Sequence, residues 1–165
     1  LFATSFGGYV SLLSLSALQP MPARLVLRAP AVQMAKTFRT RILRDGFAEY
    51  ETKRSVSCGF ERKMRVPYSF YRELQANNAA SVIPAVPTLL LRAGADELIE
   101  PDDLSAFAKN APLIQLVDIA GAGHRFKEPG ALDRVIDAAA EWLLQAASGC
   151  AGSEKAALFP LGIQR

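Results

Sequence analysis

A serine near the start of the chain stands in a setting that suits nucleophilic chemistry. Ser5 is followed by Gly7 and Gly8, between an apolar segment at Leu1 and Phe2 and a run of small and apolar residues. A serine on a sharp turn from strand to helix, with small neighbours, is typical of a nucleophile elbow. A serine two positions before a glycine is also a common helix cap, so the motif alone leaves both interpretations open.

An aspartate and a histidine follow two later apolar runs. Asp96 and Glu97 come just after residues 87–93, and His124, the only histidine, lies in a glycine-containing loop after residues 113–119. Asp96 could simply stabilise a turn, and an isolated histidine is often an ordinary surface or core residue. Glu97 is a competing acid that falls one position too late for the motif considered below.

The three residues gain meaning from the elements that must position them. Residues 24–30, 87–93 and 113–119 are short apolar runs that predict buried strands. We expect helices over residues 11–18, from a cap at Asp102 or Asp103 to Asn110, and from Leu132 to Ala147. The last has apolar residues at helical spacing, namely Leu132, Val135, Ile136, Ala139 and Leu143.

Alternating strands and helices with short connections predict an α/β fold, in which a parallel sheet is flanked by helices. Carboxyl ends of parallel strands share one edge, so Ser5, Asp96 and His124 are expected to meet there. A serine, a histidine and an acid so arranged can perform nucleophilic acyl transfer.

Along the chain the order is Ser5, Asp96 and His124. With this order, the motifs resemble the C-terminal part of an α/β-hydrolase-fold serine hydrolase. The nearest likeness is to small hydrolases akin to serine aminopeptidases and to the prolyl oligopeptidase catalytic domain. Residues 4–8 are similar to the elbow, although Ala3 stands where the family has glycine. Residues 87–99 are similar to the strand and loop that carry the acid, with the glycine displaced to Gly94, and residues 121–126 to the histidine loop.

The resemblance implies a partial α/β-hydrolase fold over residues 1–147, containing only the last strands of the sheet. Residues 148–165 have no clear periodicity, and we expect an irregular tail there. The resemblance also implies that Ser5 attacks an ester, thioester or amide of a small-molecule or peptide substrate, His124 transfers the proton and Asp96 orients His124. The N–H of Phe6 would supply one oxyanion donor. The second donor of the family comes from a loop that precedes the elbow and has no counterpart here.

Residues 31–80 differ in character from the rest, with many basic residues and interspersed aromatic ones. They fall where the family inserts a cap, and there they would line a substrate entrance that favours an anionic or aromatic acyl group. A solvated basic face over a few core aromatics is the alternative. No stacking motif accompanies the basic residues, so we expect no nucleic-acid partner.

Composition narrows the classes further. The chain has 165 residues, half of them apolar, with a net charge of +3, which excludes a disordered tail or a fibrous rod. The apolar opening is interrupted by glycines and hydroxyl residues, so we expect no membrane span. Cys58 and Cys150 lack metal-ligand spacing, and no phosphate-binding motif is present, so we expect no metal or other cofactor. The two cysteines fit a reducing compartment at least as well as an oxidising one, and we expect a cytoplasmic location.

Two hypotheses of different classes remain. The first is a serine hydrolase that forms an acyl-enzyme through Ser5, His124 and Asp96. The second is a truncated, catalytically inert relative that acts only as a partner or structural chain. In either case the strand at Leu1 and Phe2 would be an open sheet edge, through which an oligomer could form.

Overall fold

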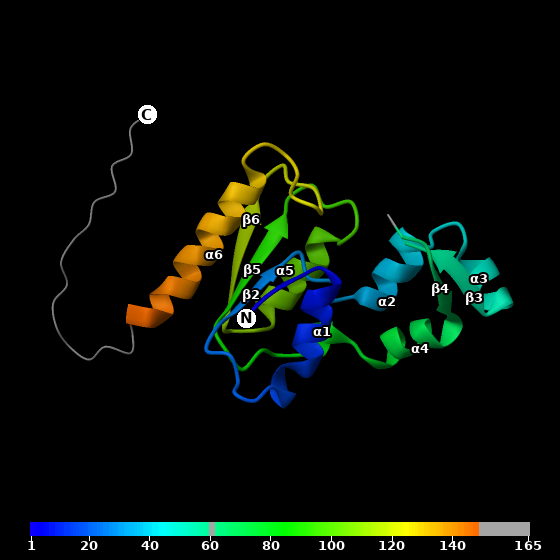
Figure 1. Cartoon of the computed structure of the whole chain (residues 1–165), viewed down its shortest axis with the longest axis horizontal. Helices are drawn as coiled ribbons and strands as arrows, with labels where there is room; N and C mark the ends of the chain where they lie inside the picture. The colour runs from blue at the N-terminus through cyan, green and yellow to red at the C-terminus, as the bar shows by residue number, and fades with distance from the viewer. Residues whose placement is uncertain (60–61, 149–165) are drawn as a thin grey trace.

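The computed structural model describes residues 1–59 and 62–148, and its centre is a parallel sheet (Figure 1). Four strands lie in the order β1-β2-β5-β6, each parallel to its neighbour. Their bounds are β1 Phe2–Thr4, β2 Leu25–Arg28, β5 Thr88–Ala93 and β6 Ile114–Ile119. The predicted strands are confirmed to within two residues at each end. The predicted α/β class with a parallel sheet is therefore the observed one.

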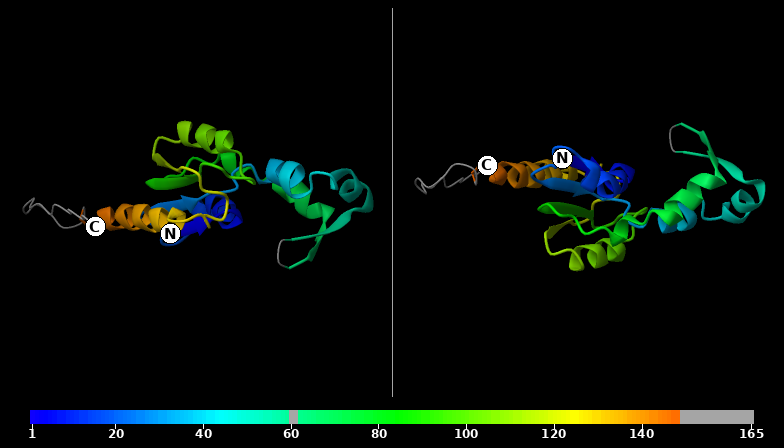
Figure 2. Two further views of the ribbon diagram at one scale, coloured as in Figure 1. Left: turned by 90° about the horizontal axis from the view of Figure 1, so that it is seen from above. Right: turned by 90° about the horizontal axis from the view of Figure 1, so that it is seen from below.

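Helices cover both faces of this sheet (Figure 2). Helices α1 (Phe6–Ser14), extended by the 3₁₀ turn η1 (Leu15–Ala17), and α5 (Pro101–Lys109) pack on one face. Helix α6 (Ala131–Ser148) packs on the other. Strands β2 and β5 lie between the layers with nearly every side chain buried, which explains their continuous apolar runs.

Two helix predictions need correction. Helix α1 begins at Phe6 rather than Ser11, because the chain turns sharply into the helix at Ser5. Helix α5 begins at Pro101, and neither Asp102 nor Asp103 caps it: both lie in its first turn. Proline suits the first helical position because that position needs no N–H donor, and acidic residues there complement the helix dipole.

Helix α6 buries a narrower strip than its apolar pattern predicts. Val135 and Ala139 pack against the sheet, whereas Leu132 and Ile136 remain 47% and 54% exposed. Leu143 lies on the same flank as these two and is also exposed. The predicted irregular tail lies outside the described residues from position 149 on.

A cap-like insertion separates β2 from β5 and lies beside the sheet (Figure 1). Its elements are α2 (Met34–Thr37), the π-helical turn η2 (Phe38–Ile42), α3 (Phe47–Lys53), the antiparallel pair β3 (Ser55–Cys58) and β4 (Met64–Pro67), α4 (Tyr68–Ala76) and η3 (Ala79–Ser81). We keep the name cap for residues 31–80.

The cap has an aromatic interior of its own. Phe38, Tyr50 and Tyr71 are buried, and the ring of Phe38 contacts the rings of Tyr50, Phe70 and Tyr71. The Tyr50 hydroxyl donates a hydrogen bond to the carbonyl of Pro67 at 2.6 Å, which ties α3 to β4. Most cap aromatics therefore form a core, as the alternative interpretation of this segment expects.

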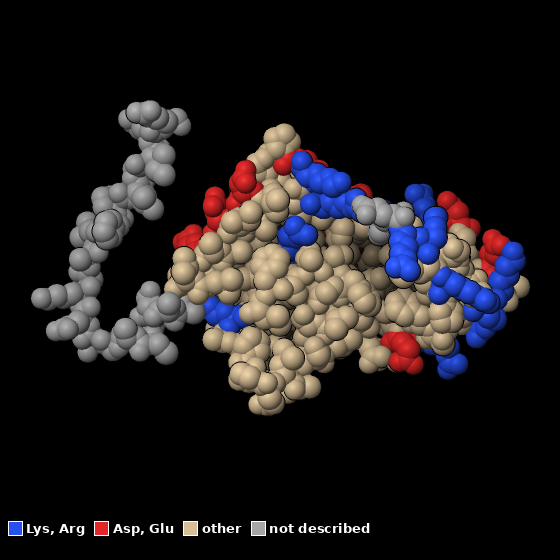
Figure 3. Space-filling model, viewed as in Figure 1, with Lys and Arg blue, Asp and Glu red and all other residues tan. Residues whose placement is uncertain are grey.

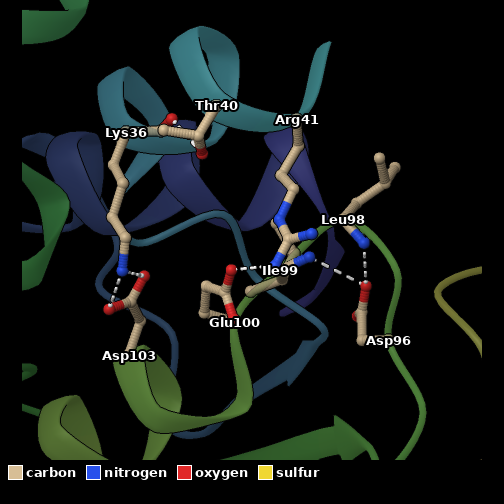
Figure 4. A network of polar contacts seen from close by, with 8 residues as sticks. All are labelled: Lys36, Thr40, Arg41, Asp96, Leu98, Ile99, Glu100 and Asp103. Carbon is tan, nitrogen blue, oxygen red and sulfur yellow. Dashed lines mark hydrogen bonds and ion pairs between the residues drawn. The ribbon is translucent and has the colours of Figure 1, made fainter. Parts of the chain in front are cut away.

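Ion pairs attach the cap to the sheet domain (Figure 4). The Lys36 ammonium contacts the Asp103 carboxylate at 2.8 Å, and Arg41 pairs with Glu100. Both acids lie at the start of α5, directly after the loop that carries Asp96. The pairs are partly exposed, so each contributes at most about 1 kcal/mol to stability.

Candidate active site

Ser5 occupies a strained turn between β1 and α1. Its backbone has φ 49° and ψ −121°, a positive φ in a residue that has a side chain. Such a conformation costs about 1–3 kcal/mol and is concentrated at functional sites. The Ser5 N–H donates to the Arg28 carbonyl at 2.9 Å, and the Ser5 carbonyl accepts from Ala31 at 3.1 Å. These two hydrogen bonds therefore hold the turn at Ser5 against the end of β2 and the residues that follow it.

Gly8 is the glycine that this arrangement requires. A Cβ at position 8 would lie 2.7 Å from the Cβ of Pro30, whereas a Cβ at position 7 would meet nothing within 4 Å. Helix α1 thus passes close against the loop after β2 only because residue 8 has no side chain. Ala3, in place of the usual glycine, is buried without difficulty.

Asp96 is held rigidly after the end of β5. Its Oδ1 accepts hydrogen bonds from the N–H groups of Leu98 at 2.9 Å and Ile99 at 2.8 Å (Figure 4). Its side chain is only 1% exposed. A buried carboxylate with two backbone donors is fixed in orientation, and one face of it is left for a further donor.

That further group is His124, in the loop after β6. The Nδ1 of His124 lies 3.1 and 3.0 Å from the two carboxylate oxygens of Asp96. On the other side of the ring, Nε2 lies 2.9 Å from the Oγ of Ser5. The histidine side chain is 9% exposed. The structure therefore brings together all three residues that the sequence singled out, from the ends of β1, β5 and β6.

This geometry suits removal of the Ser5 proton. With Nδ1–H donated to Asp96, the lone pair of Nε2 faces the serine hydroxyl at hydrogen-bond distance. Phe6, the predicted oxyanion donor, is the first residue of α1, so its N–H has no acceptor within the helix. It lies next to Ser5 at the helix N-terminus, where negative charge is stabilised.

Glu97 has a role that the sequence did not reveal. Its Oε2 accepts a hydrogen bond from the backbone N–H of His124 at 2.9 Å. Gly123 permits this approach, since a Cβ there would lie 3.2 Å from that oxygen and 3.0 Å from Oε1 of Glu128. The sequence motif predicts that Asp96 contacts the imidazole ring of His124. Only the conformation of the loop shows that Glu97 accepts a hydrogen bond from the backbone N–H of His124.

We expect replacement of Glu97 by alanine to lower kcat/KM about tenfold, because small displacements of a catalytic base reduce rates steeply. Glutamine retains an acceptor oxygen and should restore most of the rate. Glu128→Gln, which alters the other carboxylate near Gly123, serves as the matched control. Steady-state ester hydrolysis together with thermal melting separates misplacement from unfolding. An unchanged kcat/KM in Glu97→Ala would exclude the role.

A large cavity opens beside Ser5, between the sheet domain and the cap. Its volume is about 840 Å³, and Ser5, Phe6 and His124 line one part of it. The cap supplies an apolar wall that includes Met34, Phe38, Ile42, Val66 and Phe70. Figure 3 shows a hollow between the two parts, with Lys and Arg side chains gathered beside it. The cap thus lines a cavity beside Ser5 in addition to forming its own core, and its role as a substrate entrance stays a prediction.

Cys58 also lines this cavity. Partial burial raises the pKa of its thiol, and the nearby charge of Lys63 opposes this only in part. The thiol is therefore mostly protonated at neutral pH. Within residues 1–59 and 62–148, no three metal-ligating side chains gather, and no helix has the length and hydropathy to cross a membrane.

Comparison with solved structures identifies the fold. Over 89% of its length the chain superposes on Est1E from Butyrivibrio proteoclasticus, with a TM-score of 0.73 and 18% identity. Mouse alpha/beta hydrolase domain-containing protein 10 gives a TM-score of 0.70 at 19% identity over 88% of the chain. The esterase domain of a Rhodothermus marinus protein gives 0.66 at 17% identity, also over 88%. The fold is that of an α/β-hydrolase.

The chain spans only part of this fold. It covers 60% of Est1E, 62% of the mouse protein and 60% of the Rhodothermus domain. No family model and no curated protein matches the sequence. The neighbours are hydrolases and esterases, so the likeness supports a hydrolase fold in general, and the predicted nearness to serine aminopeptidases and prolyl oligopeptidases stays a prediction.

Proposed function

We propose that this chain carries the nucleophile, base and acid of a serine hydrolase that acts on an ester, thioester or amide. The observation that carries the proposal is the unbroken series of contacts from Ser5 Oγ to His124 Nε2 at 2.9 Å and from His124 Nδ1 to Asp96. The apolar cavity beside Ser5 provides room for an acyl group.

In the proposed reaction, Ser5 Oγ attacks the substrate carbonyl while His124 Nε2 takes the hydroxyl proton. Asp96 holds the imidazole in the required tautomer and stabilises its charged form. The Phe6 N–H donates to the developing oxyanion. His124 then passes the proton to the leaving group, and an acyl-Ser5 ester remains. Water, activated by His124, attacks this ester, releases the acid and restores Ser5.

The test is hydrolysis of a series of p-nitrophenyl esters, from acetate to decanoate, by the 165-residue chain. An acyl-enzyme predicts a burst of p-nitrophenolate and a preference for acyl chains long enough to enter the cavity. Ser5→Ala should abolish both, whereas Ser69→Ala, at another serine lining the cavity, should not. Equal rates in the wild type and in Ser5→Ala would reject the proposal.

A second candidate function is that of an inert relative which acts as a partner chain. The observation that favours it is the exposed edge of the described sheet, where β1 pairs with β2 and Phe2 is 46% exposed. An exposed apolar strand is a template for pairing with another chain. Sedimentation of the wild type and of Phe2→Lys tests this. A concentration-dependent oligomer of the wild type that dissociates to monomers in Phe2→Lys supports the partner function. A wild-type chain that stays monomeric contradicts it.

A further inference from the structure

The cavity beside Ser5 combines an apolar wall with arginines. Arg62 and Arg65, from the segment that forms β4 and the residues before it, line the same cavity as Ser5 and His124, and so does Arg125 from the loop after β6. From these neighbours we infer that the cavity binds an apolar group that carries an anion. The identity of this group rests on the proposed function: in a serine hydrolase, it is the acyl part of the substrate.

The remaining cations of the cap are mostly engaged in structural contacts. Lys36, Arg41 and Lys53 pair with acidic side chains, and Arg39 and Arg54 lie over aromatic rings. In contrast, no carboxylate in the described part of the chain lies within salt-bridge distance of Arg62 or Arg65. Arg65 Nε donates a hydrogen bond to Ser55 Oγ at 3.4 Å.

Glu73 is the one carboxylate among the described residues that line the cavity, and it forms no ion pair with Arg62 or Arg65. The carboxylate of Glu73 accepts a hydrogen bond from the Asn77 amide at 3.5 Å, on its own helix α4. Its charge also contributes to the raised pKa of Tyr9, behind burial as the larger cause, which places it toward α1. The lining therefore keeps an excess of positive charge.

Arginine recognises planar anions such as carboxylates and sulfonates with paired hydrogen bonds. Next to an apolar wall, such contacts are less screened by water than on an open surface. The occupant that fits both features has an aliphatic or aryl body and a terminal carboxylate or sulfonate. An acyl group of this kind would place its carbonyl at Ser5 and its body along the cap.

The test uses two fluorescent probes that differ by one charge. These are 1-anilinonaphthalene-8-sulfonate and N-phenyl-1-naphthylamine, which share an aromatic skeleton and differ in the sulfonate. We expect the wild-type chain to bind the sulfonate about tenfold more tightly than the neutral amine. The double variant Arg62→Gln/Arg65→Gln should lose this difference and keep its affinity for the neutral probe.

Arg72→Gln is the matched control, because Arg72 lies on α4, is exposed and does not line the cavity. It should keep the tenfold difference. Equal affinity for the two probes in the wild type, or the same loss in Arg72→Gln, would overturn the inference. Since probe binding needs no catalysis, arginine-dependent binding without ester hydrolysis would retain the anion site and reject the proposed function.

Discussion

Asp96→Asn is expected to lower kcat/KM for ester hydrolysis by about 10⁴-fold, with the fold intact. The two backbone donors, Leu98 and Ile99, require an oxygen at the position of Asp96 Oδ1. The amide N–H of asparagine must then point at His124 Nδ1. His124 Nδ1 can therefore only accept a hydrogen bond and cannot carry the proton. The proton moves to Nε2, and the ring loses the lone pair that faces Ser5.

Steady-state kinetics and a denaturant curve together check this expectation. Asp103→Asn is the matched control, because Asp103 pairs with Lys36 (Figure 4), whereas the His124 ring is hydrogen-bonded to Asp96 and Ser5. It should change kcat/KM by less than about twofold. If Asp96→Asn kept more than a tenth of the wild-type rate, Asp96 would not orient the base.

Alanine substitution at the adjacent glycines Gly7 and Gly8 of α1 should change the free energy of unfolding in opposite directions. Gly8→Ala places a Cβ 2.7 Å from Pro30 Cβ and 3.1 Å from its Cα, so the helix or the loop after β2 must shift. Overpacking of this kind costs about 1–3 kcal/mol. Gly7→Ala meets no atom within 4 Å and should stabilise the chain by about 0.5–1 kcal/mol, because glycine in a helix is entropically costly.

Urea unfolding of both variants measures the difference in the free energy of unfolding. The shift forced by Gly8→Ala also moves Ser5, which is hydrogen-bonded through its carbonyl to Ala31, so activity should fall with stability. A stable, active Gly8→Ala variant would show that α1 does not depend on close approach to Pro30.

The sheet could be predicted because its strands are short apolar runs separated by turn residues. Nearly all side chains of β2 and β5 are buried, β6 is an apolar run interrupted by Gln115 and Asp118, and two of the candidate site residues follow β5 and β6. The cap could not be predicted in detail. Its helices are short, its aromatic core comes from the three separate elements η2, α3 and α4, and the spacing of these residues in the sequence does not predict their contacts.

Other features depend on tertiary contacts that one sequence does not encode locally. The pattern of α6 indicated one apolar face, but the sheet covers only the strip around Val135 and Ala139. In the sequence, Glu97 lies one position too late for the motif that carries the acid. In the structure, its carboxylate accepts a hydrogen bond from the backbone N–H of His124. In the same way, Gly7 and Gly8 looked equivalent, and only the position of Pro30 distinguishes them.

The most direct test of the central claim is labelling with a fluorophosphonate probe, which reacts with an activated serine. We predict that the probe labels Ser5 in the wild-type chain and in Ser69→Ala. The Ser5→Ala variant should not be labelled, and His124→Ala should react far more slowly. A folded wild-type chain that takes up no label, or one labelled equally in Ser5→Ala, would contradict the claim that Ser5 is an activated nucleophile.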